Sequence, residues 1–189
     1  MRENGSATTQ QPARQGANAV PMGHSEIYSL SVGKEFFMNK DFSARLMQSA
    51  DKDEYFNMSR DFYASGVTNS VIDDNGREKF WKEILSKEIV RGYFILCDGK
   101  TAGYAVCCLS ASQEACGRLL WLDELYIKPY FRGKGLGSQF FKFLENTDEY
   151  GYIRLEVERD NARALNLYKS LGYADANYLS LYKKTAKEN

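Results

Sequence analysis

The amino-acid sequence predicts an α/β protein in which a mixed central β-sheet carries helices on both faces. Apolar runs of strand length alternate with stretches whose apolar residues repeat at helical spacing, and a glycine-rich turn joins the longest run, residues 119–127, to a helix. The chain has 189 residues, of which 43% are hydrophobic, enough for one domain with a substantial core. We therefore expect the order β-αα-βββ-α-β-α-β in a single domain over residues 26–189.

Residues 1–25 are expected to lie outside this domain. They are rich in Gln, Ala, Asn, Gly and Ser and show no apolar periodicity. The segment is therefore predicted to be disordered or an artificial extension.

The first half of the domain should contain a strand, two helices and two further strands. In chain order, we expect these elements at residues 42–46, 51–63, 77–87, 93–97 and 104–109. The first helix places Tyr55, Met58 and Phe62 on one face, and residues 65–75 between the helices are expected to form a loop. The Asp-Gly-Lys sequence at residues 98–100 predicts a hairpin turn between the last two strands.

The second half should alternate strands and helices. We expect a strand at 119–127, a helix from residue 136, a strand at 152–157, a helix at 162–171 and a strand at 177–182. The apolar stripe of the first of these helices consists of Leu136, Phe140, Phe143 and Leu144.

The charge balance argues against two classes of partner. The chain has 25 basic and 25 acidic residues, so no global field attracts nucleic acid or an anionic membrane. No apolar run approaches the roughly 20 residues that span a bilayer, and the N-terminus lacks the apolar core of a secretion signal. We expect a cytoplasmic protein without nucleic-acid or membrane partners.

The cysteines and the single histidine argue against other chemistries. Cys97, Cys107, Cys108 and Cys116 lack the spacing of a metal site or a disulfide framework and are expected to be small buried side chains. An acyl-cysteine route needs a base for the thiol, and His24 in the polar N-terminal segment is the only histidine. We therefore expect neither a metal site nor histidine-based acid–base catalysis.

The glycine-rich turn at residues 132–137 is typical of an anion site. Gly133, Gly135 and Gly137 permit positive φ angles, and the free N–H groups and the helix dipole point to one place. The mononucleotide P-loop pattern fails because Ser138 follows Gly137 in place of lysine, and the dinucleotide pattern fails because its third glycine would fall on Ser138. Both common nucleotide-binding interpretations are thus disfavoured.

Two motifs in sequence order suggest another ligand for this turn. The first is Arg132-x-x-Gly135-x-Gly137, and the second is the run N-A-R-A-L-N-L-Y-K-S-L-G-Y at residues 161–173. They resemble the R/Q-x-x-G-x-G/A loop and the N-x-x-A-x-x-x-Y-x-x-x-G-F/Y closing motif of the GNAT superfamily of N-acetyltransferases. The chain is similar to this family closely over residues 123–173 and more loosely over 42–184.

The resemblance implies acetyl-CoA as cosubstrate and transfer of its acetyl group to a primary amine by direct attack in a ternary complex. It also implies that two strands splay apart and that the pantetheine arm lies between them. Tyr130 departs from the family, in which an acidic residue is frequent at this position. The implied cofactor-binding residues are Leu125, Tyr126, Ile127, Arg132, Gly133, Lys134, Gly135, Leu136, Gly137, Ser138, Asn161 and Tyr168. Asn161 is also a preferred N-cap for the helix that follows it.

Three carboxylates are candidates for the proton acceptor that an amine substrate needs. Asp123 and Glu124 lie in an otherwise apolar strand, where an unpaired carboxylate costs several kcal/mol, and strand alternation places them on opposite faces. We expect Glu124 to face the acceptor amine, as a base through a water or as an anchor for the ammonium. The structural alternative for Glu124 is an ion pair, for instance with Arg154. Glu156, on the neighbouring strand, is the other candidate.

Tyr168 is expected to be catalytic. The resemblance makes it the general acid whose hydroxyl protonates the departing coenzyme thiolate. The alternative is an aromatic residue that only packs on Ala164 and Leu171 at helical spacing.

The sequence leaves the acceptor and two further functions open. A cationic amine, on a small molecule or on a peptide or protein, is favoured by the acidic residues Asp73, Asp74, Asp123, Glu124 and Glu156. Homodimerisation is an expectation at the level of the family only. The alternative functions are a non-catalytic acyl-CoA sensor and a transferase of a larger acyl group.

Overall fold

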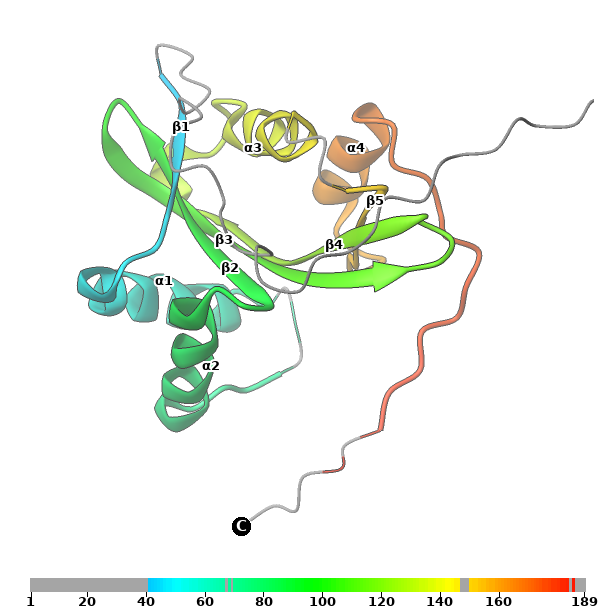
Figure 1. Cartoon of the computed structure of the whole chain (residues 1–189). Coiled ribbons are helices and arrows are strands. Elements are labelled where there is room, and N and C mark those ends of the chain that lie inside the picture. Colours follow the sequence, from blue (N-terminus) through cyan, green and yellow to red (C-terminus); the bar gives the residue numbers. More distant parts are fainter. Residues whose placement is uncertain (1–40, 67, 69, 147–149, 184, 186–189) are drawn as a thin grey trace, which may run out of the picture. The chain divides into compact units, whose positions relative to one another are not determined.

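The computed structural model describes residues 41–66, 68, 70–146, 150–183 and 185. The predicted segment 1–25 lies outside this part of the chain. The described residues form a five-stranded sheet with helices on both faces (Figure 1). The strands are β1 (Ser43–Leu46), β2 (Val90–Cys97), β3 (Lys100–Ser112), β4 (Gly117–Ile127) and β5 (Tyr152–Leu155). The helices are α1 (Lys52–Ala64), α2 (Asp74–Ser86), α3 (Leu136–Glu145) and α4 (Ala162–Ser170), with 3-10 turns η1 (Ser49–Asp51) and η2 (Pro129–Phe131).

The sheet has the mixed topology that the sequence predicts. Strands β1 to β4 pair antiparallel in chain order, and β5 pairs parallel to β4 after the crossover through α3. At the β2–β3 turn, Asp98 and Gly99 both have positive φ angles, 50° and 73°, which is the backbone of a type I′ turn. The predicted hairpin is therefore confirmed. The longest strand, however, is β3 with 13 residues, not β4 with 11.

Two apolar clusters lie on the two sides of the sheet, between it and the helices that cover each face. On one side, α3 supplies Phe140 and Phe141, which are fully buried against strand residues such as Leu120. On the other side, Tyr55 of α1 stacks on Trp81 of α2 with ring centroids 5.5 Å apart. Both faces of the central strands are therefore buried, which explains their almost continuous apolar sequences.

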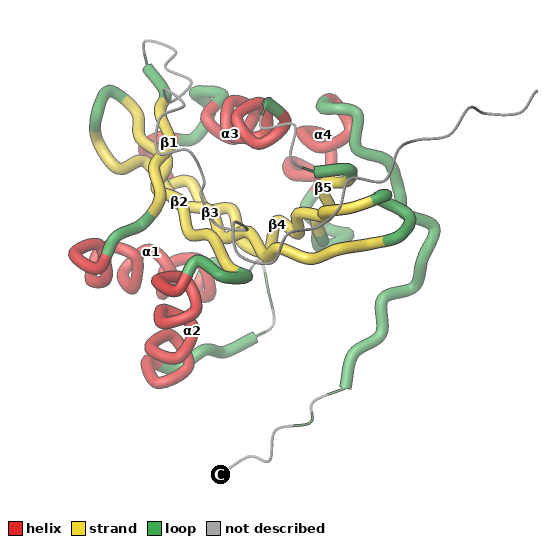
Figure 2. Tube along the Cα trace, viewed as in Figure 1, coloured by secondary structure: helices red, strands yellow, loops and turns green. Residues whose placement is uncertain are grey.

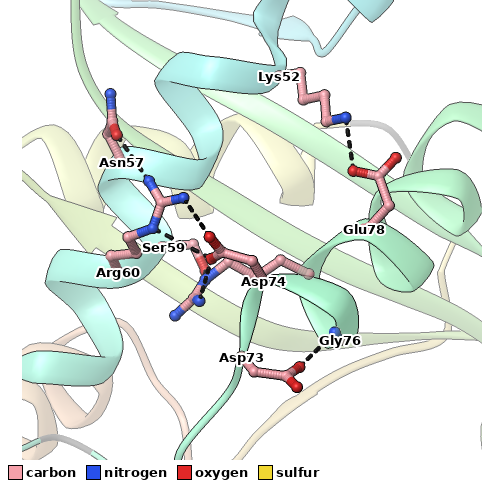
Figure 3. A network of polar contacts seen from close by, with 9 residues as sticks. Lys52, Asn57, Ser59, Arg60, Asp73, Asp74, Gly76 and Glu78 are labelled. Carbon is pink, nitrogen blue, oxygen red and sulfur yellow. Dashed lines mark hydrogen bonds and ion pairs between the residues drawn. The ribbon is translucent and has the colours of Figure 1, made fainter.

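A polar network fixes the start of α2 against α1 (Figure 3). Asp74 accepts hydrogen bonds from Arg60 and Arg77, and Arg77 also contacts the hydroxyl of the buried Ser59. The Asp73 side chain caps the helix by accepting from the backbone N–H of Gly76 at 2.7 Å. Because of this cap, α2 begins at Asp74, three residues before the predicted start.

The predicted strand at residues 177–182 is wrong. Residues 173–183 have no regular secondary structure, and the sheet ends at β5 (Figure 2). The positive φ of Asn177, 55°, turns the backbone, and the residues beyond it pair with no described strand. An extended segment becomes a strand only when its backbone groups find a ladder partner.

The cysteines follow the expectation except at one position. Cys97 and Cys107 are buried and Cys108 is half-buried, but Cys116 is exposed in the β3–β4 turn. Burial raises the pKa of the Cys107 thiol, which disfavours its nucleophilic form. In the ranges that the structure describes, no helix combines the length and the apolar character needed to cross a membrane.

Candidate functional site

Strands β4 and β5 separate halfway along β4. Their parallel ladder ends at the pair Leu122 and Leu155. Beyond this point β4 stays paired with β3 on one edge, whereas no described strand lies along its other edge from Asp123 to Ile127. This edge therefore offers unpaired backbone groups to a ligand, as the splayed arrangement predicts.

The loop after β4 ends in the predicted glycine-rich turn. Gly133 and Gly135 adopt left-handed backbone angles, φ 81° and 74°, and α3 starts at Leu136. Within the described part of the chain, the backbone N–H groups from Gly133 to Ser138 have no hydrogen-bond acceptor. The loop thus combines free donors with the positive end of the α3 dipole.

The unpaired edge and the loop line one cleft of about 470 Å³. Its lining contains every predicted cofactor-binding residue except Lys134. The amino group of Lys134 instead lies over the rings of Tyr130 and Phe131, 5.5 and 5.3 Å from their centroids. The predicted residues in the lining are Leu125, Tyr126, Ile127, Arg132, Gly133, Gly135, Leu136, Gly137, Ser138, Asn161 and Tyr168.

Arg132 is held at the edge of this cleft by the backbone of β4. Its Nε donates to the carbonyl oxygen of Ile127 at 2.9 Å, and its guanidinium lies 5.9 Å from the ring centroid of Tyr126. These two contacts orient the side chain while its terminal nitrogens keep their donor capacity.

Helix α4 closes the cleft with Asn161 and Tyr168. The Asn161 side chain accepts from the N–H of Ala164 at 3.1 Å, so the capping interpretation is confirmed. The Tyr168 ring packs edge-on against Phe141, with centroids 5.5 Å apart, and lies 6.1 Å from Tyr173. Packing on α3 and on Tyr173 therefore fixes the ring.

The hydroxyl of Tyr168 is available to a ligand. It forms no hydrogen bond within the described residues. Every fully buried side-chain oxygen of these residues has a partner, so the unpaired Tyr168 oxygen must be accessible to solvent, and the residue lines the cleft. Partial burial raises the pKa of the Tyr168 phenol. The side chain is thus protonated at neutral pH, the form that donates a proton.

Glu124 lies beneath the site rather than in the lining of the cleft. Its side chain is 5% exposed and accepts hydrogen bonds from Tyr63 at 2.6 Å and from Tyr104 at 2.7 Å. Burial raises the pKa of Glu124, and the two tyrosine hydroxyls oppose that shift. The ion pair considered with Arg154 is not formed, because Arg154 pairs with Glu114. The burial of this carboxylate is thus offset by two short hydrogen bonds.

A β-bulge at Asp123 changes the pattern of side-chain directions. Val106 pairs with Glu124 and Cys107 with Leu122, so Asp123 is the extra residue of β4. The strict alternation that predicts opposite faces for Asp123 and Glu124 therefore does not apply here. Local burial and the neighbouring Glu156 raise the pKa of Asp123.

Eight residues of the site were not predicted from the sequence, among them Phe131, Arg163, Ala164 and Leu167 of the cleft lining. Tyr63 and Tyr104 hold Glu124, and Phe62 and Ser65, at the end of α1, line the cleft. A cross-strand signal exists for Tyr104, which pairs with Tyr126 and is diagonal to Glu124. To use this signal, the register of β3 against β4 must be known, and the bulge at Asp123 makes that register hard to predict from the sequence.

A sequence model described as the acetyltransferase (GNAT) family matches residues 52–173. The chain belongs to this family. The GNAT match begins at the first residue of α1 and ends after α4, so it includes the splayed strands, the glycine loop and Tyr168.

Relatives of this GNAT chain are N-acetyltransferases. It is 39% identical over 62 residues to thialysine N-epsilon-acetyltransferase from Bos taurus, which covers 31% of the chain and only 36% of that enzyme. An uncharacterized N-acetyltransferase from Lactobacillus delbrueckii subsp. lactis is 28% identical over 146 residues, covering 68% of the chain and 83% of that protein. The solved structure of AAC(6')-Iy with the bisubstrate analog CoA-S-monomethyl-acetylneamine has the same fold, with a TM-score of 0.62 at 15% identity over 77% of this chain and 99% of that one.

Proposed function

We propose that the protein is an N-acetyltransferase that moves an acetyl group from acetyl-CoA to a primary amine by direct attack in a ternary complex. One observation carries this proposal: the glycine loop, the unpaired edge of β4 and the hydroxyl of Tyr168 line a single cleft. The same cleft thus offers groups for an anion, for an extended amide chain and for a leaving thiolate.

The cleft fits coenzyme A on the chemistry of its own residues. The free N–H groups from Gly133 to Ser138 are donors for a pyrophosphate. A Cβ added at Gly133 or Gly135 meets no atom of the described residues within 4 Å, so they leave space over the loop for a ligand. The unpaired groups of β4 would bond the amides of the pantetheine arm as another strand does. That AAC(6')-Iy binds a coenzyme A conjugate supports this assignment.

Tyr168 is the proposed general acid. Its ring is fixed by Phe141 and Tyr173, while its hydroxyl bonds to none of the described residues and is accessible in the cleft. The raised pKa keeps the proton on the phenol until a thiolate forms beside it. Backbone N–H groups near Leu125 and Tyr126 are the proposed donors to the thioester carbonyl.

Glu124 is the proposed final acceptor of the amine proton, and it acts through Tyr63. Phe62 and Ser65 line the cleft, and Tyr63 and Ala64 lie between them in the chain at the end of α1. In this scheme, the Tyr63 oxygen takes a proton from the amine as its own proton passes to Glu124 across the 2.6 Å hydrogen bond. The raised pKa of Glu124 makes it a stronger acceptor than an exposed carboxylate.

The proposed acceptor is a small cationic amine. Asp123 and Glu156 follow the last β4–β5 pair, so their negative charges meet where the strands separate. The thialysine enzyme and AAC(6')-Iy are named or crystallised with small amine acceptors, which supports the same class here. A lysine side chain of a peptide presents the same ammonium and is the alternative acceptor.

The test is thiol release from acetyl-CoA with a panel of diamines, amino sugars and lysine peptides. Turnover with at least one primary amine supports the proposal. Calorimetry on the same protein separates the alternatives: coenzyme binding without turnover would indicate an acyl-CoA sensor, and no binding at all would contradict the assignment of the cleft. Faster turnover with propionyl- or succinyl-CoA would indicate a larger acyl group.

A further inference from the structure

We propose that Arg77 is a positioning residue for acyl transfer: from α2, its enclosed guanidinium favours the ionised, proton-accepting form of the Glu124 carboxylate. This role rests on the function proposed above, because only there does Glu124 receive a proton from the amine. Three features carry it, namely the burial of Arg77, the contacts that lead from its side chain to the Glu124 carboxylate, and the sign of its charge.

Arg77 is a charged side chain in a place where a charge is costly. It is 7% exposed on the side of α2 that contacts α1. Its ion-pair partner among the described residues, Asp74, has a side chain that is 63% exposed and that also binds Arg60 (Figure 3). An exposed, shared carboxylate compensates a buried guanidinium only in part, because water screens it. Anchoring of α2 does not require this buried charge, since Asp73 caps the helix and Arg60 already holds Asp74.

A chain of enclosed contacts leads from Arg77 to the carboxylate. The Arg77 Nε donates to the hydroxyl of Ser59 at 3.3 Å, and Ser59, which is 1% exposed, shares a hydrogen bond with the Tyr55 hydroxyl. The Tyr55 ring meets that of Tyr104 edge-on, with centroids 5.2 Å apart, and the Tyr104 hydroxyl donates to Glu124 at 2.7 Å. Arg77 is therefore joined to the site through α1 and β3.

Among the described groups around Glu124, Arg77 supplies the positive charge. The charged or titratable groups that interact with this carboxylate are Tyr55 and Tyr63 of α1, Arg77 of α2, Tyr104 and Cys108 of β3, and Asp123 of β4. Burial raises the pKa of the three tyrosines and of the thiol, so they are neutral at pH 7, and Asp123 repels a charge on Glu124. The charge of Arg77 thus opposes the rise that burial causes in the pKa of Glu124.

The charge of Arg77 reaches both groups of the proposed proton relay. It favours the anionic form of Tyr63 as well as that of Glu124. A base must be free of its proton before it can accept one from the amine. Burial alone would leave more of Glu124 protonated near neutral pH, and Arg77 counters this effect. Arg77 therefore extends the pH range of the relay downward.

The first measurement is the pKa of Glu124, which requires no turnover. Carbon-13 NMR of the side-chain carboxyl groups follows the titration in the full chain, and Glu124→Gln identifies the signal. Arg77→Gln is expected to raise this pKa by roughly 0.5 to 1, less than the roughly 1 to 3 that a direct ion pair gives, because Ser59 and Tyr55 lie between the two groups. Arg77→Lys keeps the charge and should restore the wild-type value. An Arg77→Gln protein in which Glu124 titrates as in the wild type would overturn the proposal.

Two further variants separate the charge of Arg77 from its packing. Arg77→Met keeps an apolar stem without the charge, so it repeats the test if Arg77→Gln does not fold. Asp74→Asn breaks the same ion pair but leaves Arg77 charged, and the loss of a negative charge should not raise the pKa of Glu124. A rise as large as that in Arg77→Gln would show that displacement of α2 explains the effect, which would refute the role of the charge.

The second measurement is the pH dependence of kcat/KM with acetyl-CoA and an amine that the wild type acetylates. The acidic limb should move to higher pH in Arg77→Gln by the same amount as the pKa and return in Arg77→Lys, with unchanged affinity for coenzyme A. An acidic limb that stays in place while the pKa of Glu124 moves would contradict the positioning role. A wild type that acetylates no amine would refute the acyl transfer, and this role with it, whatever the NMR titration shows.

Discussion

Replacing Tyr168 by phenylalanine separates the chemistry of this residue from its packing. The change removes one hydroxyl and keeps the ring contacts with Phe141 and Tyr173 at 5.5 and 6.1 Å. Because the hydroxyl has no partner among the described residues, the free energy of unfolding should change by no more than about 1 kcal/mol, or roughly 2 to 4 °C in Tm. Loss of a positioned general acid should slow acyl transfer by roughly 10² to 10⁴, about 3 to 5 kcal/mol in the barrier.

The assay is the single-turnover rate of acyl transfer, measured beside the melting temperature and the affinity for coenzyme A. Tyr173→Phe is the matched control, because Tyr173 belongs to the same aromatic cluster but does not line the cleft. We expect a slow, stable Tyr168→Phe and a control of normal rate. Equal rates in wild type and Tyr168→Phe would refute the acid role and leave Tyr168 as a packing residue.

Three further substitutions test the loop, the buried carboxylate and a helix cap. Gly135→Val should abolish coenzyme A binding in calorimetry, because valine disfavours φ 74° and its side chain enters the space over the loop. Glu124→Gln should lower turnover at neutral pH with little change in coenzyme affinity, measured as a pH–rate profile. Because the pKa of Glu124 is raised on folding, the folded protein binds the Glu124 proton more tightly than the unfolded chain does. The free energy of unfolding of the wild type therefore falls as the pH rises from the ordinary glutamate pKa through the raised one. Glu124→Gln should remove this decrease in stability. Asp73→Ala should cost about 1 kcal/mol in denaturant unfolding, because the capping bond to α2 is lost.

For each of these substitutions, one experimental outcome would contradict the prediction. Gly99→Val introduces the same side chain at φ 73° in the β2–β3 turn, so an equal loss of binding there would mean that general destabilisation explains Gly135→Val. An unchanged pH–rate profile would return Glu124 to a structural role. An Asp73→Ala protein of wild-type stability would show that water replaces the cap.

The sequence predicted the elements whose signal is local. The periodicity of Tyr55, Met58 and Phe62 gave α1 to within one residue, and the Asp-Gly turn gave the hairpin with its left-handed angles. The glycine loop and the Asn161 cap were predicted for the same reason, since backbone freedom and capping depend on one or two neighbouring residues. Predicting these features therefore does not require knowing which residues pair across the sheet.

Features that depend on distant pairing were not predicted. The residues that hold Glu124 come from α1 and β3, 61 and 20 positions away in the chain, so only the folded structure brings them together. The prediction of a strand at 177–182 was wrong for a related reason. An alternating sequence favours an extended backbone, but it does not determine whether a sheet edge is there to pair with it. Lys134 was assigned from its place in the motif, but its side chain turns back over Tyr130 and Phe131.

The bulge at Asp123 makes the length of β4 as important as its composition. Before it, Leu120 and Leu122 face the cluster beneath α3; after it, Leu125 and Ile127 face that cluster, and Glu124 faces the opposite one. Deleting Asp123 would restore strict alternation and leave Glu124, Leu125 and Ile127 on their present faces. A residue added after Asp123 would instead rotate the remaining strand by half a period, which would drive a carboxylate under α3 and carry two aliphatic chains to the tyrosines. Loss of Asp123 should therefore be better tolerated than the gain of a residue beside it.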